Sequence, residues 1–142
     1  MALRVDRREL AAVFTGGVIG TLARVAMSLA FAPGAHSWPW VVFAVNLSGT
    51  LIIGWLVTRL QERLPLSTYR RQLLATGFCG AYTTFSTLQL ELLSMFDARR
   101  YALAAAYLGT SVICGYLAVH VSTAAARGVH VARFTITLQV DR

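Results

Sequence analysis

GFCGAYTTFSTL, residues 77–88, lies inside a long apolar segment and yet holds two glycines, three threonines and a serine. Serine and threonine hydroxyls compete for backbone hydrogen bonds, so they disfavour a continuous helix. In a membrane, a helix break is tolerated only where protein or a cavity covers it. We therefore predict a broken transmembrane helix, in which Gly80 adopts dihedral angles that other residues avoid and the hydroxyls of Thr83 and Thr84 stabilise the turn. The carbonyls freed by such a break are ligands for Na⁺ or K⁺.

The rest of the chain has the composition of a membrane protein. Of its 142 residues, 56% are hydrophobic and only 13% are charged. Since about 20 apolar residues span a bilayer, the charge pattern predicts four transmembrane helices. A soluble helical bundle would need a polar face, which these segments lack. Four runs contain at most one charged residue each: residues 10–31, 38–58, 72–96 and 101–126.

The first apolar run has an alternative interpretation. A basic start followed by an apolar stretch is also typical of a signal peptide. However, the run is longer than a signal core and Arg24 interrupts it. We expect the segment to be retained as the first membrane helix.

The basic residues are all arginines, and their positions predict an orientation. Ten lie in regions that four crossings place on one side, and only Arg99 and Arg100 lie on the other. By the positive-inside rule, both termini are predicted to be cytoplasmic in a multi-pass plasma-membrane protein, and no nucleic-acid partner is implied. The ten are Arg4, Arg7, Arg8, Arg59, Arg63, Arg70, Arg71, Arg127, Arg133 and Arg142.

The sequence divides into a transmembrane domain, residues 1–126, and a basic C-terminal tail, residues 127–142. Apolar and polar residues alternate from Phe134 to Val140, which predicts a short strand, an interfacial segment or disorder. In the transmembrane domain, Gly16 and Gly20 have the spacing that lets membrane helices approach closely. So small a bundle has little interior, and we expect it to form a dimer.

Polar residues inside the predicted helices are candidate functional residues, because they are costly in lipid. Arg24 either extends to the headgroups or attracts an anion. Asn46 either joins helices or donates its NH₂ group to an anion. Tyr107 and Ser111 lie one turn apart on one helix face. The first, second and fourth helices hold these donors without a carboxylate, which favours an anion pathway.

Phe85, next to the predicted break, has two interpretations. Its ring either packs against other apolar groups or presents its electropositive edge to an anion. No nucleophile–base pair or set of metal ligands is visible, so we do not expect an enzyme. Besides an anion pathway, two functions stay open at this point: a small dimeric multidrug-type transporter and a non-transporting membrane assembly protein.

Four motifs together resemble the CrcB or Fluc family of small fluoride channels. The resemblance covers residues 14–120, and the motif of the third helix is the most specific. The motifs are GGVIGTLAR (16–24), VNLSG (45–49), GFCGAYTTFST (77–87) and YLGTSVICG (107–115).

The resemblance implies an antiparallel, dual-topology dimer of four-helix subunits that exports toxic cytoplasmic fluoride passively through two pores. It also implies a structural Na⁺ at the dimer centre that is not transported and is held by the backbone carbonyls of Gly80 and Thr83. The residues implied for the anion pathway are Asn46, Phe85, Tyr107, Ser111 and, in the vestibule, Arg24.

Two features depart from the family pattern. Leu88 stands where the resemblance implies a second pore phenylalanine, and leucine has no electropositive ring edge. The strong arginine bias also fixes one orientation, whereas a dual-topology homodimer must insert both ways. We therefore hypothesise that the chain pairs with an oppositely oriented paralogue in a heterodimer.

Overall fold

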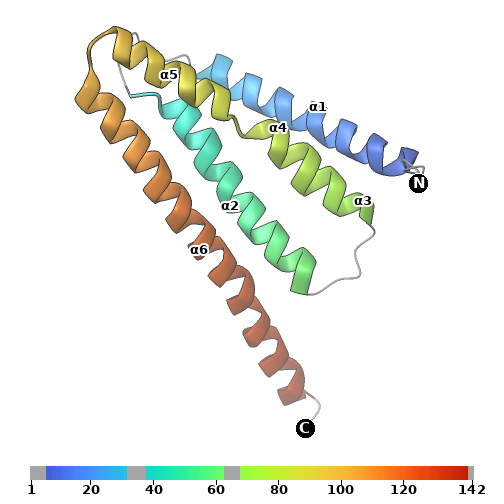
Figure 1. Cartoon of the computed structure of the whole chain (residues 1–142). Coiled ribbons are helices and arrows are strands. Elements are labelled where there is room, and N and C mark those ends of the chain that lie inside the picture. The colour runs from blue at the N-terminus through green and yellow to red at the C-terminus, as the bar shows by residue number, and fades with distance from the viewer. Residues whose placement is uncertain (1–5, 32–37, 63–67, 141–142) are drawn as a thin grey trace, which may run out of the picture.

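The third helical segment of the protein is interrupted, and the other three are long. The computed structural model describes residues 6–31, 38–62 and 68–140, whose regular elements are all helices. Three of them, α1, α2 and α6, contain stretches long and apolar enough to cross a membrane. In chain order the elements are α1 (Arg7–Ala30), α2 (Trp40–Glu62), α3 (Thr68–Arg71), the π-helix η1 (Gln72–Cys79), α4 (Gly80–Tyr82), α5 (Phe85–Asp97) and α6 (Tyr101–Val140). The prediction of an all-α protein with four helical segments and a break near the middle of the third is confirmed (Figure 1).

The helix ends are arranged as four crossings require. The start of α1, the end of α2, the start of α3 and the end of α6 lie toward one side of the molecule, and the turn from α5 to α6 lies at the other (Figure 1). At the start of α1, Asp6 Oδ1 accepts a hydrogen bond from the Arg8 N–H at 2.8 Å, and Asp6 Oδ2 accepts one from the Tyr69 hydroxyl at 3.1 Å. This carboxylate therefore caps α1 and ties it to α3.

Glycines allow α1 to lie directly against the first half of the third segment. A Cβ atom at Gly16 would collide with the Leu73 carbonyl, and one at Gly20 would collide with the Phe78 carbonyl. Gly77 in η1 faces α1 in the same way, with no room for a side chain beside the Val13 carbonyl. The predicted close approach is confirmed, and its partner is the backbone of η1 and α4.

The turn between α5 and α6 closes α5 with a Schellman motif. Arg99 N–H donates to the Phe96 carbonyl at 2.9 Å, and Arg100 N–H donates to the Met95 carbonyl at 2.8 Å. The motif requires a left-handed residue after the helix, and Arg99 takes that conformation with φ 55°. Glycine usually occupies this position, so Arg99 holds a conformation that its side chain disfavours.

Of the three alternatives predicted for the C-terminal tail, the short strand is wrong. α6 runs for 40 residues, from Tyr101 to Val140, so Phe134–Val140 is helical. At about 1.5 Å per residue the helix is about 60 Å long, twice the thickness of a bilayer core. The helix crosses the predicted boundary at residue 126 without a break, and the division into a membrane domain and a tail stays a prediction.

A small buried cluster holds α5 against α6 and the start of α2. It consists of Val42, Leu88, Met95, Ala104 and Tyr107. Trp38, just before α2, packs on this cluster, and its ring meets the Tyr107 ring edge to face at 5.3 Å. The cluster positions the polar face of α6 next to Asn46 of α2.

Candidate functional site

The break in the third segment is a two-residue extended link. Thr83 and Thr84 have β-region dihedral angles, with φ −74°, ψ 154° and φ −144°, ψ 121°. The Thr83 hydroxyl donates to the Cys79 carbonyl at 3.0 Å, and Thr84 Oγ1 accepts from the Thr87 N–H at 3.2 Å. The two hydroxyls therefore close α4 and cap α5, as predicted.

The conformational role predicted for Gly80 is wrong. Gly80 has ordinary helical angles, φ −63° and ψ −31°, and the chain leaves the helix three residues later. No described glycine has a positive φ. Gly80 is exposed, and a Cβ atom there would meet nothing within 4 Å.

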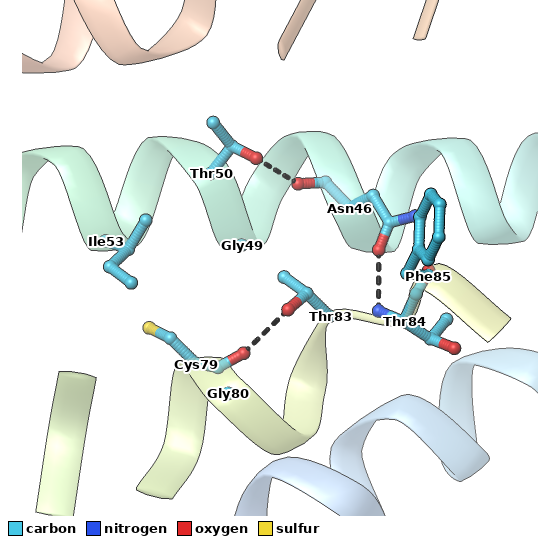
Figure 2. A pocket seen from close by; sticks show the side chains of 9 residues that line it. All are labelled: Asn46, Gly49, Thr50, Ile53, Cys79, Gly80, Thr83, Thr84 and Phe85. Atoms are coloured by element: carbon cyan, nitrogen blue, oxygen red, sulfur yellow. Dashed lines mark hydrogen bonds between the residues drawn. The ribbon is translucent and has the colours of Figure 1, made fainter. Parts of the chain in front are cut away.

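Asn46 holds the break from the side of α2. Its Nδ2 donates to the Thr84 carbonyl at 2.9 Å, and its Oδ1 accepts from the Thr84 N–H at 2.8 Å (Figure 2). The side chain thus pairs with both backbone groups of one extended residue, as a neighbouring strand would. Since a carboxamide has two N–H donors, one N–H of Asn46 is left for another acceptor.

The break also removes the usual helical donors from several carbonyls, among them those of Gly80 and Thr83. In a continuous helix the Gly80 carbonyl would accept from the Thr84 N–H, which here donates to Asn46. The Thr83 carbonyl would likewise accept from the Thr87 N–H, which here donates to Thr84 Oγ1. Gly80 and Thr83 are therefore two of the residues whose carbonyls the break makes available.

An open cavity of about 300 Å³ lies beside the break, between α2 and the third segment. Its wall has polar groups both on the link and on α2, together with apolar side chains (Figure 2). The lining residues are Asn46, Gly49, Thr50, Ile53, Cys79, Gly80, Thr83, Thr84 and Phe85. We call this space the break cavity. Phe85 is 71% exposed in the subunit, so its ring edge is accessible.

A second, smaller cavity of about 40 Å³ lies on the other side of Asn46, between α2 and α6. Asn46 and Thr50 line both cavities, so the two cavities lie on adjoining faces of α2. Ser111 and Gly115 line the smaller cavity from α6. Of the predicted face of α6, Ser111 thus shares a cavity with Asn46, and Tyr107 lies in the buried cluster.

Buried polar atoms without partners cluster on this side of α6. Tyr107 is fully buried, and its hydroxyl has no hydrogen-bond partner. Ser111 Oγ and Trp38 Nε1 are also buried and unpaired. Buried polar groups are normally paired, so a group of unpaired donors in one region indicates a polar ligand or water there. Trp38 was not predicted as a site residue from the sequence, because an aromatic residue before a helix is usually a packing residue.

Arg24 does not lie in either cavity wall. Its Nε donates to the Ala81 carbonyl at 3.2 Å, across 57 positions of sequence. Neither of the two predicted roles, extension to the headgroups and attraction of an anion, includes this bond. Leu88, by contrast, is buried beside Tyr107 in the cluster described above, with 8% of its surface exposed.

Comparison with known proteins gives a family match over most of the chain. The family model described as "CrcB-like protein, Camphor Resistance (CrcB)" matches residues 11–123. The matched range contains α1 from its second turn, all of α2 and the broken segment, and most of the membrane-length part of α6.

Individual relatives match over similar lengths. "Fluoride-specific ion channel FluC 1" of Mycolicibacterium paratuberculosis is 54% identical over 128 residues, which is 90% of this chain and 97% of the relative. The protein of the same name from Mycobacterium tuberculosis is 52% identical over the same shares. "Fluoride-specific ion channel FluC" of Bacteroides fragilis is 37% identical over 116 residues, 79% of this chain and 91% of the relative.

Proposed function

The chain belongs to the CrcB family of fluoride-specific ion channels, and from this premise we propose that the break cavity and the smaller cavity behind Asn46 are this subunit's part of the fluoride pathway. The protein is a membrane channel for fluoride and not an enzyme. This assignment sets aside the multidrug-type transporter and the assembly protein. The assignment as a fluoride channel rests on the 54% identity to the Mycolicibacterium paratuberculosis relative over 90% of this chain.

Fluoride suits the donors that this subunit offers. The ion is small and strongly hydrated, so a pathway must replace its water with closely spaced donors. The second N–H of Asn46 and the unpaired hydroxyls of Tyr107 and Ser111 are such donors, and the exposed edge of Phe85 adds a weak electropositive surface. None of these groups carries a full charge, and an ion must bind weakly enough to leave.

Transport through this pathway is passive. Weakly acidic HF crosses membranes, ionises in the cytoplasm and is trapped there as fluoride. A channel lets the trapped ion leave down its own gradient and so limits its toxicity. We place the channel in the plasma membrane with both termini in the cytoplasm, because ten arginines flank that side and two flank the other.

The carbonyls of Gly80 and Thr83 fit the structural Na⁺ that we propose. Hard cations prefer oxygen ligands, and these two carbonyls have lost their helical donors to Asn46 and Thr84. A bound Na⁺ would supply a fixed positive charge that joins subunits and is not transported. Two carbonyls are few ligands for Na⁺, so the remaining ones would come from a second subunit.

A dimer follows from the openness of this site. Gly80 is exposed, Phe85 is 71% exposed, and the break cavity opens on the subunit surface, so a second, antiparallel subunit would complete it. We propose a heterodimer with an oppositely oriented paralogue. The fixed orientation supports this pairing, and so does the buried aliphatic Leu88, which supplies no ring edge beside Tyr107.

The test is fluoride efflux from liposomes, followed with a fluoride electrode. We expect rapid efflux, without chloride efflux, when the chain is reconstituted with its paralogue, and little when it is reconstituted alone. Rapid efflux from the single chain would exclude the heterodimer and keep the channel. No fluoride efflux under either condition would exclude the pathway proposed for these cavities.

A further inference from the structure

Arg24 ends a stripe of residues that joins α1 to the broken segment. Gly16, Gly20 and Arg24 are spaced by four residues, so they lie on one face of α1. The two glycines bring the α1 backbone into contact with Leu73 and Phe78 of η1. One turn further along α1, this contact reaches α4, and the residue of α1 at that position is Arg24 and not a small residue.

The arginine meets a carbonyl that the break has deprived of its donor. In a continuous helix the Ala81 carbonyl would accept from the Phe85 N–H, but Phe85 begins α5 beyond the extended link. Arg24 Nε donates to this carbonyl at 3.2 Å in a partly buried position. A buried carbonyl without a donor is destabilising, and in lipid no water is at hand to replace one.

The break is therefore held from two sides by side chains. Arg24 of α1 bonds the residue just after Gly80, and Asn46 of α2 bonds the residue just after Thr83. We infer that Arg24 is a positioning residue, whose Nε–H fixes α4 so that the Gly80 and Thr83 carbonyls keep one orientation. This role is distinct from attracting an anion, because it needs a donor at one atom and no charge.

Variants of Arg24 with side chains of matched length distinguish the effect of the hydrogen-bond donor from the effect of the charge. Glutamine Nε2 lies as many bonds from Cα as arginine Nε, so Arg24→Gln retains a donor at that position and loses the charge. Arg24→Lys retains the charge and has a methylene group at that position. Arg24→Met has neither. Each variant is made in the full-length chain and purified with its paralogue.

The first measurement is amide hydrogen exchange of residues 80–88. We expect exchange in Arg24→Met to be about tenfold faster than in the unmodified protein, and exchange in Arg24→Gln to be close to unmodified. If Arg24→Met does not fold, Arg24→Lys takes its place as the variant without a donor at the Nε position. Exchange in Arg24→Gln as fast as in the variant without this donor would overturn the proposal.

The second measurement is the Na⁺ concentration that half-saturates thermal stabilisation, with N-methylglucamine as the replacement cation. This measurement alone depends on the Na⁺ site of the proposed function. We expect the half-saturating concentration to rise about tenfold in Arg24→Met and to stay unchanged in Arg24→Gln. A Na⁺-dependent unmodified protein with equal shifts in both variants would contradict the positioning role. If the unmodified protein does not respond to Na⁺, the Na⁺ site is wrong, and the exchange measurement still decides the role of Arg24.

Discussion

The side chain of Asn46 and the backbone of Thr84 form a closed pair of hydrogen bonds at 2.8 and 2.9 Å, across 38 positions of sequence. The pair satisfies both backbone groups of an extended residue that no strand accompanies. The same side chain lies between the break cavity and the smaller cavity that Ser111 lines. Of the two roles that its position in the sequence leaves open, Asn46 has the first, helix joining, and its donation to an anion stays a proposal.

Replacing Asn46 should affect stability and transport to different extents in two variants. Asn46→Leu removes both bonds to Thr84 and should lower the free energy of unfolding by about 2–4 kcal/mol. Asn46→Asp retains the acceptor for the Thr84 N–H, so it should be less destabilised, while its charge should reduce fluoride efflux by about tenfold or more. Thr58→Val is the matched control, because the Thr58 hydroxyl bonds only within its own helix, to the Gly54 carbonyl, and Thr58 lines neither cavity. Normal efflux from Asn46→Asp would contradict a role for this amide in the pathway.

Removing the unpaired hydroxyls of α6 should have the opposite effect on stability and the same effect on fluoride efflux. Tyr107→Phe and Ser111→Ala each remove a buried polar atom that has no partner in the protein. We therefore expect stability to be unchanged or raised by about 1 kcal/mol, and fluoride efflux to fall. Thermal melting and liposome efflux measured on the same preparations check both parts. A clear loss of stability in Tyr107→Phe would show that its hydroxyl has a structural partner.

The contact between α1 and η1 can be tested with neighbouring glycines. Gly20→Ala places a methyl group against the Phe78 carbonyl and should destabilise the protein by about 1–3 kcal/mol. Gly17→Ala is the control, because a Cβ atom there meets nothing within 4 Å, and it should be neutral or stabilising by up to about 1 kcal/mol. The melting temperatures of the two purified variants give the comparison. Equal melting temperatures would mean that α1 does not lie against η1 as described.

The left-handed residue after α5 gives a prediction about stability alone. Arg99→Gly relieves the disfavoured φ of 55°, whereas Arg99→Ala retains it, and both variants lose the same charge. Arg99→Gly should therefore be more stable than Arg99→Ala by about 1 kcal/mol. The check is the difference in melting temperature between the two. Fluoride efflux should be the same in both, since this turn lies at the far end of α5 from the break.

Local chemistry explains which features could be predicted from the sequence. The break follows from hydroxyls that act on backbone groups three or four residues away, as Thr83 does on Cys79. The face of α6 with Tyr107 and Ser111 follows from helical spacing alone. In both cases the residues that decide the structure are neighbours in the sequence.

Features that depend on distant contacts could not be predicted. The bond from Arg24 to Ala81 joins α1 to a carbonyl 57 positions away, and nothing near either residue indicates it. Alternating residues in the tail allowed a strand, an interfacial segment or disorder, but α6 continues through them, which local alternation does not reveal. The conformation of Gly80 was mispredicted because glycine permits unusual angles without requiring them.

The π-helix η1 determines how the residues after it are rotated about the helix axis. A π-helix closes its bonds over five residues and an α-helix over four, so converting Gln72–Cys79 to an α-helix would rotate the later residues about the helix axis. Gly77 would then turn from α1, the Ala81 carbonyl would turn from Arg24, and Thr84 would turn from Asn46. The irregular turns of η1 therefore set how the break is rotated about the helix axis, although η1 holds only one residue of the break cavity, Cys79.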